Sequence, residues 1–168
     1  MSAIPVILLI FLMFFGCGNP QGNENDCPLG QPTAIFSDTL KEIQSQKFEV
    51  TGQESLETVQ FKNGVELELA QRGCEEISQE FQFRLLELAD QNKTIAWVEA
   101  GVEQFKFLAT LGEQFSPFFI WATSIEEQKQ NFAFNTPQEL APGFFVTFNK
   151  VAGSDYSILI VKLHTEKK

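Results

Sequence analysis

The strongest constraint on the fold lies around Asn63-Gly64, where apolar and polar residues alternate in the runs on both sides. Alternation with a period of two predicts β-strands that have one buried and one solvated face. A two-residue turn would place Phe61 opposite Glu66, so that apolar and charged side chains would share a face. A three-residue loop instead pairs Phe61 with Val65 and leaves one face apolar. The sequence therefore predicts an antiparallel hairpin with a type I turn, a G1 bulge and a left-handed Gly64.

Hydrophobic periodicity and turn residues predict the other elements. Strands are expected near residues 48–52, 76–85, 144–149 and 156–164, and helices over residues 33–45, 92–111 and 117–130. The order of helix, strands, two helices and two strands is typical of an α+β domain. We expect a single mostly antiparallel sheet of about five to six strands, with two to three helices packed on one face.

Both long helices carry local signals near their starts. Asp90 or Asn92 is expected to cap the first helix, whereas Ser116 caps the second and Pro117 takes its first position. Gly101 lies in the middle of the first helix, where glycine costs about 1 kcal/mol relative to alanine. The plainest explanation for this glycine is close packing of the helix against a neighbouring element.

A continuous apolar run, residues 3–15, precedes all these elements. As a helix it would reach about 20 Å, which is short of the ~30 Å hydrocarbon core of a bilayer. This length is typical of the apolar region of a signal peptide. Residues 1–16 are therefore interpreted as a signal peptide, residues 17–31 as a flexible tether rich in Gly, Pro and Asn, and residues 32–168 as a single α+β domain.

The sequence Phe14-Phe15-Gly16-Cys17 resembles the lipobox of bacterial lipoproteins, in which a small residue precedes the cysteine and an apolar residue stands three positions before it. The resemblance covers residues 1–17 only. It implies cleavage before Cys17 and attachment of lipid to that cysteine, which would anchor the protein in a membrane. Gly18 rather than Asp follows, which in enteric bacteria implies the outer membrane. An ordinary secretory leader is the alternative.

Three cysteines in an exported protein leave one without a partner, and lipid on Cys17 would account for it. Cys27 and Cys74 are then expected to form a disulfide in an oxidising cell envelope, with the domain in the periplasm or at the cell surface. In the chain-entropy model, a disulfide that closes a loop of about 47 residues stabilises the folded state by roughly 4 kcal/mol. A catalytic thiol is the alternative, but it needs a base, and His164 is the only histidine.

The formal net charge of −10 argues against nucleic acid as a partner, because such binding needs clustered Lys and Arg. Carboxylates gather instead on the polar face of the hairpin's second strand and of the strand that follows. We single out Glu66, Glu68, Glu76 and Glu80 as candidate residues for binding a basic protein of the cell envelope. The alternative is a solvated sheet face without a partner.

The sequence contains no P-loop, dinucleotide-binding or nucleophile-elbow motif. We therefore expect no catalytic residue, no cofactor and no metal. Glu99 and Glu103 stand one helical turn apart and could hold a metal or share a proton, but a solvated helix face is favoured. His164 is expected to be exposed near the end of the chain.

The leading hypothesis is a non-enzymatic, lipid-anchored domain that binds a protein or another partner in the cell envelope. The alternative is a carrier of an apolar ligand, suggested by the 18 phenylalanines. Its cavity would be lined by Phe81, Phe83, Phe105, Phe118, Phe144 and Phe148. A third hypothesis, a hydrolase that uses carboxylates alone, needs carboxylates buried in a cleft.

Overall fold

The computed structural model describes residues 30–73, 76–86 and 92–166. The described residues form one antiparallel sheet and two α-helices, so the α+β class and the single sheet are confirmed. The elements are β1 (Ile43–Thr51), β2 (Glu54–Phe61), β3 (Glu66–Arg72), β4 (Ser78–Leu85), α1 (Thr94–Ala109), α2 (Ser116–Glu127), β5 (Gln138–Ala141), β6 (Phe144–Ala152) and β7 (Ser157–Thr165). Short 3-10 turns, Glu113–Phe115 and Lys129–Asn131, flank α2.

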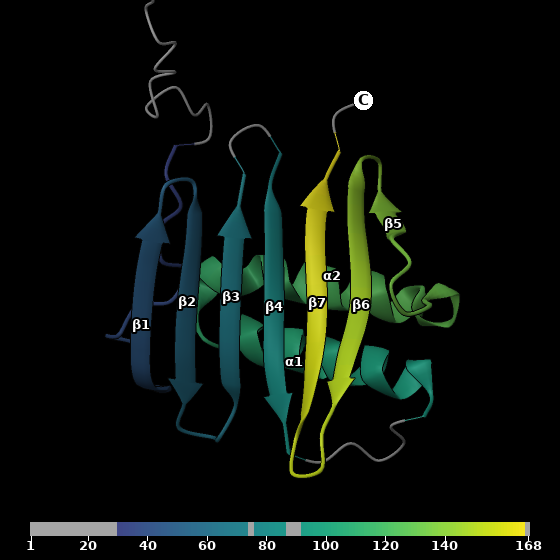
Figure 1. The fold of residues 1–168 in the computed structure, drawn as a ribbon, viewed down its shortest axis with the longest axis horizontal. Helices are drawn as coiled ribbons and strands as arrows, with labels where there is room; N and C mark the ends of the chain where they lie inside the picture. Colours follow the sequence, from purple (N-terminus) through teal and green to yellow (C-terminus); the bar gives the residue numbers. More distant parts are fainter. Residues whose placement is uncertain (1–29, 74–75, 87–91, 167–168) are drawn as a thin grey trace, which may run out of the picture.

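The seven strands lie in the order β1-β2-β3-β4-β7-β6-β5. Figure 1 shows that α1 and α2 lie side by side across one face of this sheet and leave the other face without helices. Both helices come between β4 and β5 in the chain. The last three strands join the sheet at β4, because β7 pairs with that strand. We call the helix-covered side the inner face and the opposite side the outer face.

The hairpin around Asn63-Gly64 has the predicted three-residue loop. The Phe61 amide donates to the Val65 carbonyl at 2.9 Å, and the Gly64 amide donates to the Phe61 carbonyl at 2.9 Å. Val59 pairs with Leu67 further along the ladder. Gly64 has a φ of +90°, as a left-handed turn glycine requires. This register keeps the apolar side chains of β2 and β3 on the inner face.

The expected helix over residues 33–45 is wrong. The chain instead makes turns over residues 38–42 and enters β1 at Ile43. The three residues that suggested a helical stripe do reach the core: Phe36 and Ile43 are buried, and Leu40 packs against the cluster. Turns in the chain, not a helix, bring these three side chains to the core. Their spacing therefore indicates that they are buried but not that the chain between them is helical.

The expected count of five to six strands was too low, because β5 was not foreseen. The expected caps also differ. Lys93 rather than Asn92 stands at the N-cap of α1, and Asp90 lies outside the described residues. Phe115 rather than Ser116 caps α2, because the preceding 3-10 turn continues into the helix, and Pro117 lies in its first turn.

The core is an aromatic cluster between the inner face and the two helices. The ring of Phe81 makes edge-to-face contacts with Phe105 at 5.2 Å and Phe118 at 5.8 Å between centroids. Buried core residues run from Phe36 to Leu163. The chain from residue 30 onward therefore contains a hydrophobic core of its own, and we expect it to fold without the leader.

Gly101 faces this core from the middle of α1 and is buried. A Cβ atom at this position would lie 2.7 Å from Cε1 of Phe148 and 3.5 Å from Cδ2 of Leu159. The glycine therefore lets α1 lie directly on β6 and β7, and the expectation of close packing is confirmed.

We predict that Gly101→Ala lowers the free energy of unfolding by about 1 kcal/mol, because the steric cost of 1–3 kcal/mol exceeds the gain of about 1 kcal/mol in helix propensity. Urea unfolding of the domain would measure it. In a Phe148→Leu background the same change should be neutral or stabilising. An equal loss in both backgrounds would contradict this steric explanation.

Candidate functional site

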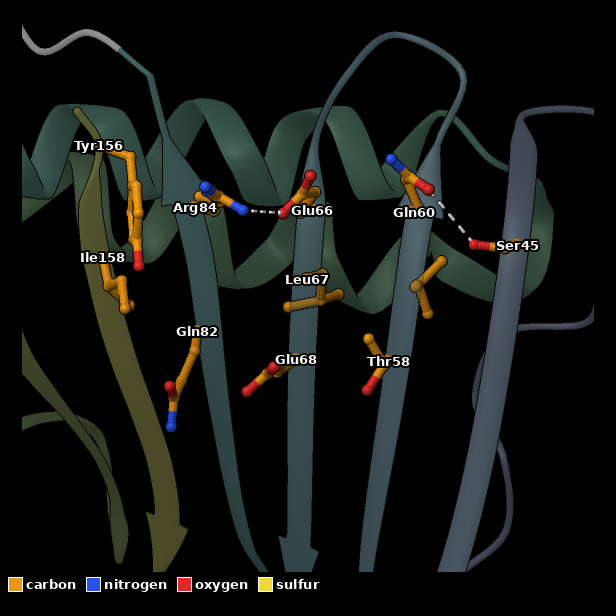
Figure 2. Close-up of a pocket in the computed structure, with 11 residues that line it drawn as sticks. Ser45, Thr58, Gln60, Glu66, Leu67, Glu68, Gln82, Arg84, Tyr156 and Ile158 are labelled. Carbon is orange, nitrogen blue, oxygen red and sulfur yellow. Dashed lines mark hydrogen bonds and ion pairs between the residues drawn. The ribbon is translucent and has the colours of Figure 1, made fainter.

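The outer face carries a shallow hollow of about 370 Å³ over β2, β3, β4 and the start of β7. Figure 2 views this hollow with the helices behind the sheet, so its polar side chains point away from the core. Its outer-face lining includes Ser45, Thr58, Gln60, Glu66, Glu68, Gln82, Arg84, Tyr156 and Ile158. These residues come from five neighbouring strands or their ends, because alternate side chains of each strand share a face.

Arg84 is held in place at one edge of the outer hollow. Its guanidinium Nη1 lies 3.0 Å from Oε2 of Glu66, which is directly opposite on β3. On its other side the guanidinium carbon lies 3.9 Å from the centre of the Tyr156 ring, a cation–π contact. Tyr156 is exposed in spite of its size. This edge of the hollow therefore offers a partner an aromatic ring beside a fixed charge pair.

Three of the four carboxylates singled out in the sequence lie together on the outer face. Glu66 and Glu68 belong to β3, and Glu80 lies on the neighbouring strand β4. Glu76 precedes β4 and lies beyond the ladder. Within the described residues Glu68 is the one of the four with neither a hydrogen bond nor an ion pair, since Glu80 accepts a hydrogen bond from Gln82 at 2.8 Å.

Basic side chains lie among these carboxylates. Arg84 is opposite Glu66, and Lys162 on β7 is opposite Glu80. Lys47 lies further out on β1, two strands from Glu68 in the same row across the sheet. The outer face therefore has charges of both signs, with an unpaired carboxylate at Glu68 inside the hollow.

A second hollow, of about 470 Å³, lies on the inner face, where β4, β6 and β7 extend past α2. We call it the α2 cleft. Its lining is mainly apolar and includes Ile35, Ile77, Phe118, Trp121, Phe144 and Leu163. The rings of Trp121 and Phe144 are 6.0 Å apart. Gln79, Gln114 and Thr165 supply polar groups.

Glu57 is fully buried, and sequence reasoning missed it. One carboxylate oxygen accepts from the Ile35 amide at 2.8 Å, and the other accepts from the Phe36 amide at 3.0 Å and from Nε2 of Gln46 at 2.9 Å. These bonds attach the segment before β1 to the sheet. A signal was present, because Glu57 is in phase with Val59 and Phe61 on the buried face.

The helices carry a network of exposed ion pairs. Lys129 lies 2.6 Å from Glu99, and Lys106 lies 2.7 Å from Glu126. The hydrogen bond and charge of Lys106 lower the pKa of Glu126, and those of Glu99 raise the pKa of Lys129. Glu99 on α1 is thus paired with Lys129 of the 3-10 turn that follows α2, and Glu103 lies on the same solvated surface.

Buried charges and grouped metal-ligating side chains are scarce among the described residues. Glu57 is the one charged residue among them that is buried, and its three donors are structural amides. No three His, Cys, Asp or Glu side chains of these residues are grouped so that they could hold a metal. His164 is not exposed as expected: its side chain is 19% accessible and stacks on Phe145. Cys17, Cys27 and Cys74 lie outside the described residues.

Five of the six phenylalanines expected to line a cavity are buried in the aromatic core, and Phe144 is partly buried at its border. Phe118 and Phe144 also reach the α2 cleft. Within the part of the chain that the structure describes, neither α1 nor α2 is long and apolar enough to cross a membrane. Comparisons with models of protein families, with curated proteins and with solved structures found no match to this chain.

We predict that Glu57→Gln lowers the free energy of unfolding by about 1–3 kcal/mol, because the new amide group would turn a donor toward donors. Hydrogen exchange at the Ile35 and Phe36 amides should become faster. Glu49→Gln, on the exposed side of β1, serves as the control. Unchanged exchange in Glu57→Gln would show that this carboxylate does not hold the segment.

Proposed function

We propose that this protein is a lipid-anchored domain of a bacterial cell envelope that binds a protein partner through its outer face and catalyses no reaction. The observation that carries the proposal is the outer hollow, in which Glu68, Arg84 and Tyr156 lie on a sheet face without helices. Aromatic and arginine side chains are enriched at the centres of protein interfaces.

Anchoring is inferred from the lipobox-like sequence that ends at Cys17. Acyl chains contribute about 0.8 kcal/mol for each buried CH₂ group, so two or more chains hold a protein stably on a bilayer. The anchor would confine the partner to the same membrane or to its neighbourhood. A weak interface is sufficient there, because confinement raises the effective concentration of the two proteins.

We predict that Cys17→Ser abolishes lipid attachment and cleavage of the leader, so that the mature lipid-anchored protein is not formed. Mass measurement of the purified protein would show cleavage before residue 17 and added acyl mass in the wild type, and an uncut leader in the variant. A wild-type protein that is cut elsewhere and carries no lipid would instead identify an ordinary secretory leader.

We predict that Glu68→Lys weakens binding of a basic partner about tenfold, because the one carboxylate without a bond among the described residues of the hollow would become a cation that repels the partner. The wild-type domain would capture the partner from envelope extract, and its affinity for each variant would then be measured. Glu68 is a cleaner test than Glu66 or Glu80, because its reversal breaks no bond within the described structure.

Glu127→Lys is the matched control, because it makes the same change of charge at an exposed position on α2, far from the outer hollow. An equal loss in both variants would indicate long-range attraction to net charge alone. Binding that neither variant changes would rule out the hollow as the interface.

A second candidate function is transport of an apolar ligand. It is supported by the α2 cleft, whose lining is mainly apolar and whose volume lies within the range of about 300–1,000 Å³ usual for ligand sites. The interior itself is filled by the phenylalanine rings, so a ligand would bind at the border of the core, beside Phe144.

A further inference from the structure

The α2 cleft has walls that are fixed before any ligand arrives. Phe118 is 4% exposed and stands in the aromatic cluster, 5.2 Å from Trp121 between ring centres. Phe144 is the first residue of β6, and its ring lines the cleft beside Trp121. A cleft between packed aromatic side chains binds apolar groups without first paying to order its own residues.

The chemistry of the lining limits what the cleft can hold. Among the described residues that line it there is no Lys, Arg, Asp or Glu, and His164, which stacks on Phe145, is the one titratable residue. The buried part of a ligand must therefore be uncharged, since an unpaired charge in such a site is costly. Glutamines and Thr165 can meet a polar group of the ligand where the cleft opens.

The position of the cleft relates it to the proposed anchor. The described chain begins at Gly30, in a small hollow that shares Ile77 and Gln79 with the α2 cleft. The chain therefore enters the domain at the end of the sheet where the cleft opens. Figure 1 shows that the C-terminal end of β7 and the start of the segment before β1 lie at this same end of the sheet.

The tether is short enough to keep this end near a bilayer. Twelve residues, 18–29, separate Cys17 from Gly30. A chain of this length spans at most about 45 Å when fully extended, and a random coil of the same length spans about 20 Å on average. A lipid on Cys17 would thus hold the cleft close to the acyl chains of the surrounding membrane.

We propose that the α2 cleft binds one acyl chain of a membrane lipid. The inference names the ligand of the second candidate function and rests on the proposed anchoring for its source. An acyl chain matches the uncharged lining, and its head group would remain at the polar opening. The cleft and the outer hollow lie on opposite faces of the sheet, so the same domain can hold a lipid chain and a protein partner.

Trp121 permits a direct test, because it lines the cleft while the second tryptophan, Trp97, is fully buried elsewhere. The probes are palmitate with a nitroxide group on its chain, and phosphatidylcholine vesicles that contain a phospholipid with the same label. Both are added to the lipid-free domain, residues 19–168. We expect saturable quenching of Trp121 fluorescence by each probe, at one chain per domain.

Two isoleucines provide a matched pair of variants. Ile77 lines the cleft and is 47% exposed, whereas Ile120 on α2 is 63% exposed and does not line it. Ile77→Glu places a carboxylate in the cleft and should weaken binding of both probes at least tenfold. Ile120→Glu should leave binding unchanged. Because both side chains are exposed, neither substitution is expected to unfold the domain, so unfolding would not account for a loss of binding.

The outcomes separate the two proposals. Absence of saturable quenching by both probes, or equal weakening in both variants, would overturn the cleft as a lipid site. Quenching by palmitate alone would overturn the membrane lipid as its source. Because this domain lacks Cys17, neither result depends on lipid attachment, which the mass of the Cys17→Ser variant decides independently.

Discussion

The ring of Phe118 connects every layer of the structure. It lies 5.8 Å from Phe81 of the sheet, 5.9 Å from Phe105 of α1 and 6.3 Å from Phe36 of the segment before β1, measured between ring centres. Offset and edge-to-face contacts of this kind add about 0.5–1.5 kcal/mol each to the burial of area. The positions of α2, of the N-terminal segment and of the helix pair on the sheet all depend on this cluster.

This cluster also determines what remains uncovered. Because Phe118, Ala122 and Ile125 turn α2 toward the middle of the strands, the ends of β4, β6 and β7 extend past the helix and leave the α2 cleft. Because both helices occupy one face, the outer face keeps no covering element in the described structure. Two candidate surfaces therefore follow from a single packing arrangement, and neither needs a change in the fold.

The sequence predicted those features that local patterns determine. The register of the hairpin follows from alternation around Gly64, and the packing of Gly101 follows from the cost of glycine within a helix. The spacing of Phe36, Leu40 and Ile43 misled, because it reports that residues are buried and not whether the chain between them is helical. β5 has four residues and forms only because β6 offers its edge.

The candidate sites were less accessible to such reasoning. The face shared by Glu66, Glu68 and Glu80 follows from alternation, but Lys162 lies opposite Glu80 only through the pairing of β4 with β7, whose residues are far apart in the chain. The α2 cleft depends on how far strands extend past a helix, which no local pattern encodes. Glu57 could have been found, since a charged residue in phase with a buried face requires partners.

The strands that carry the two surfaces keep them independent. Leu163 lines the α2 cleft, while its neighbour Lys162 lies on the outer face opposite Glu80. Successive side chains of a strand point to opposite faces, so a substitution at one surface leaves the lining of the other in place. Coupling between a bound chain and a bound partner would have to pass through the shared core. Since close-packed interiors transmit strain, any such coupling would appear as a change in the affinity of one surface when the other is occupied.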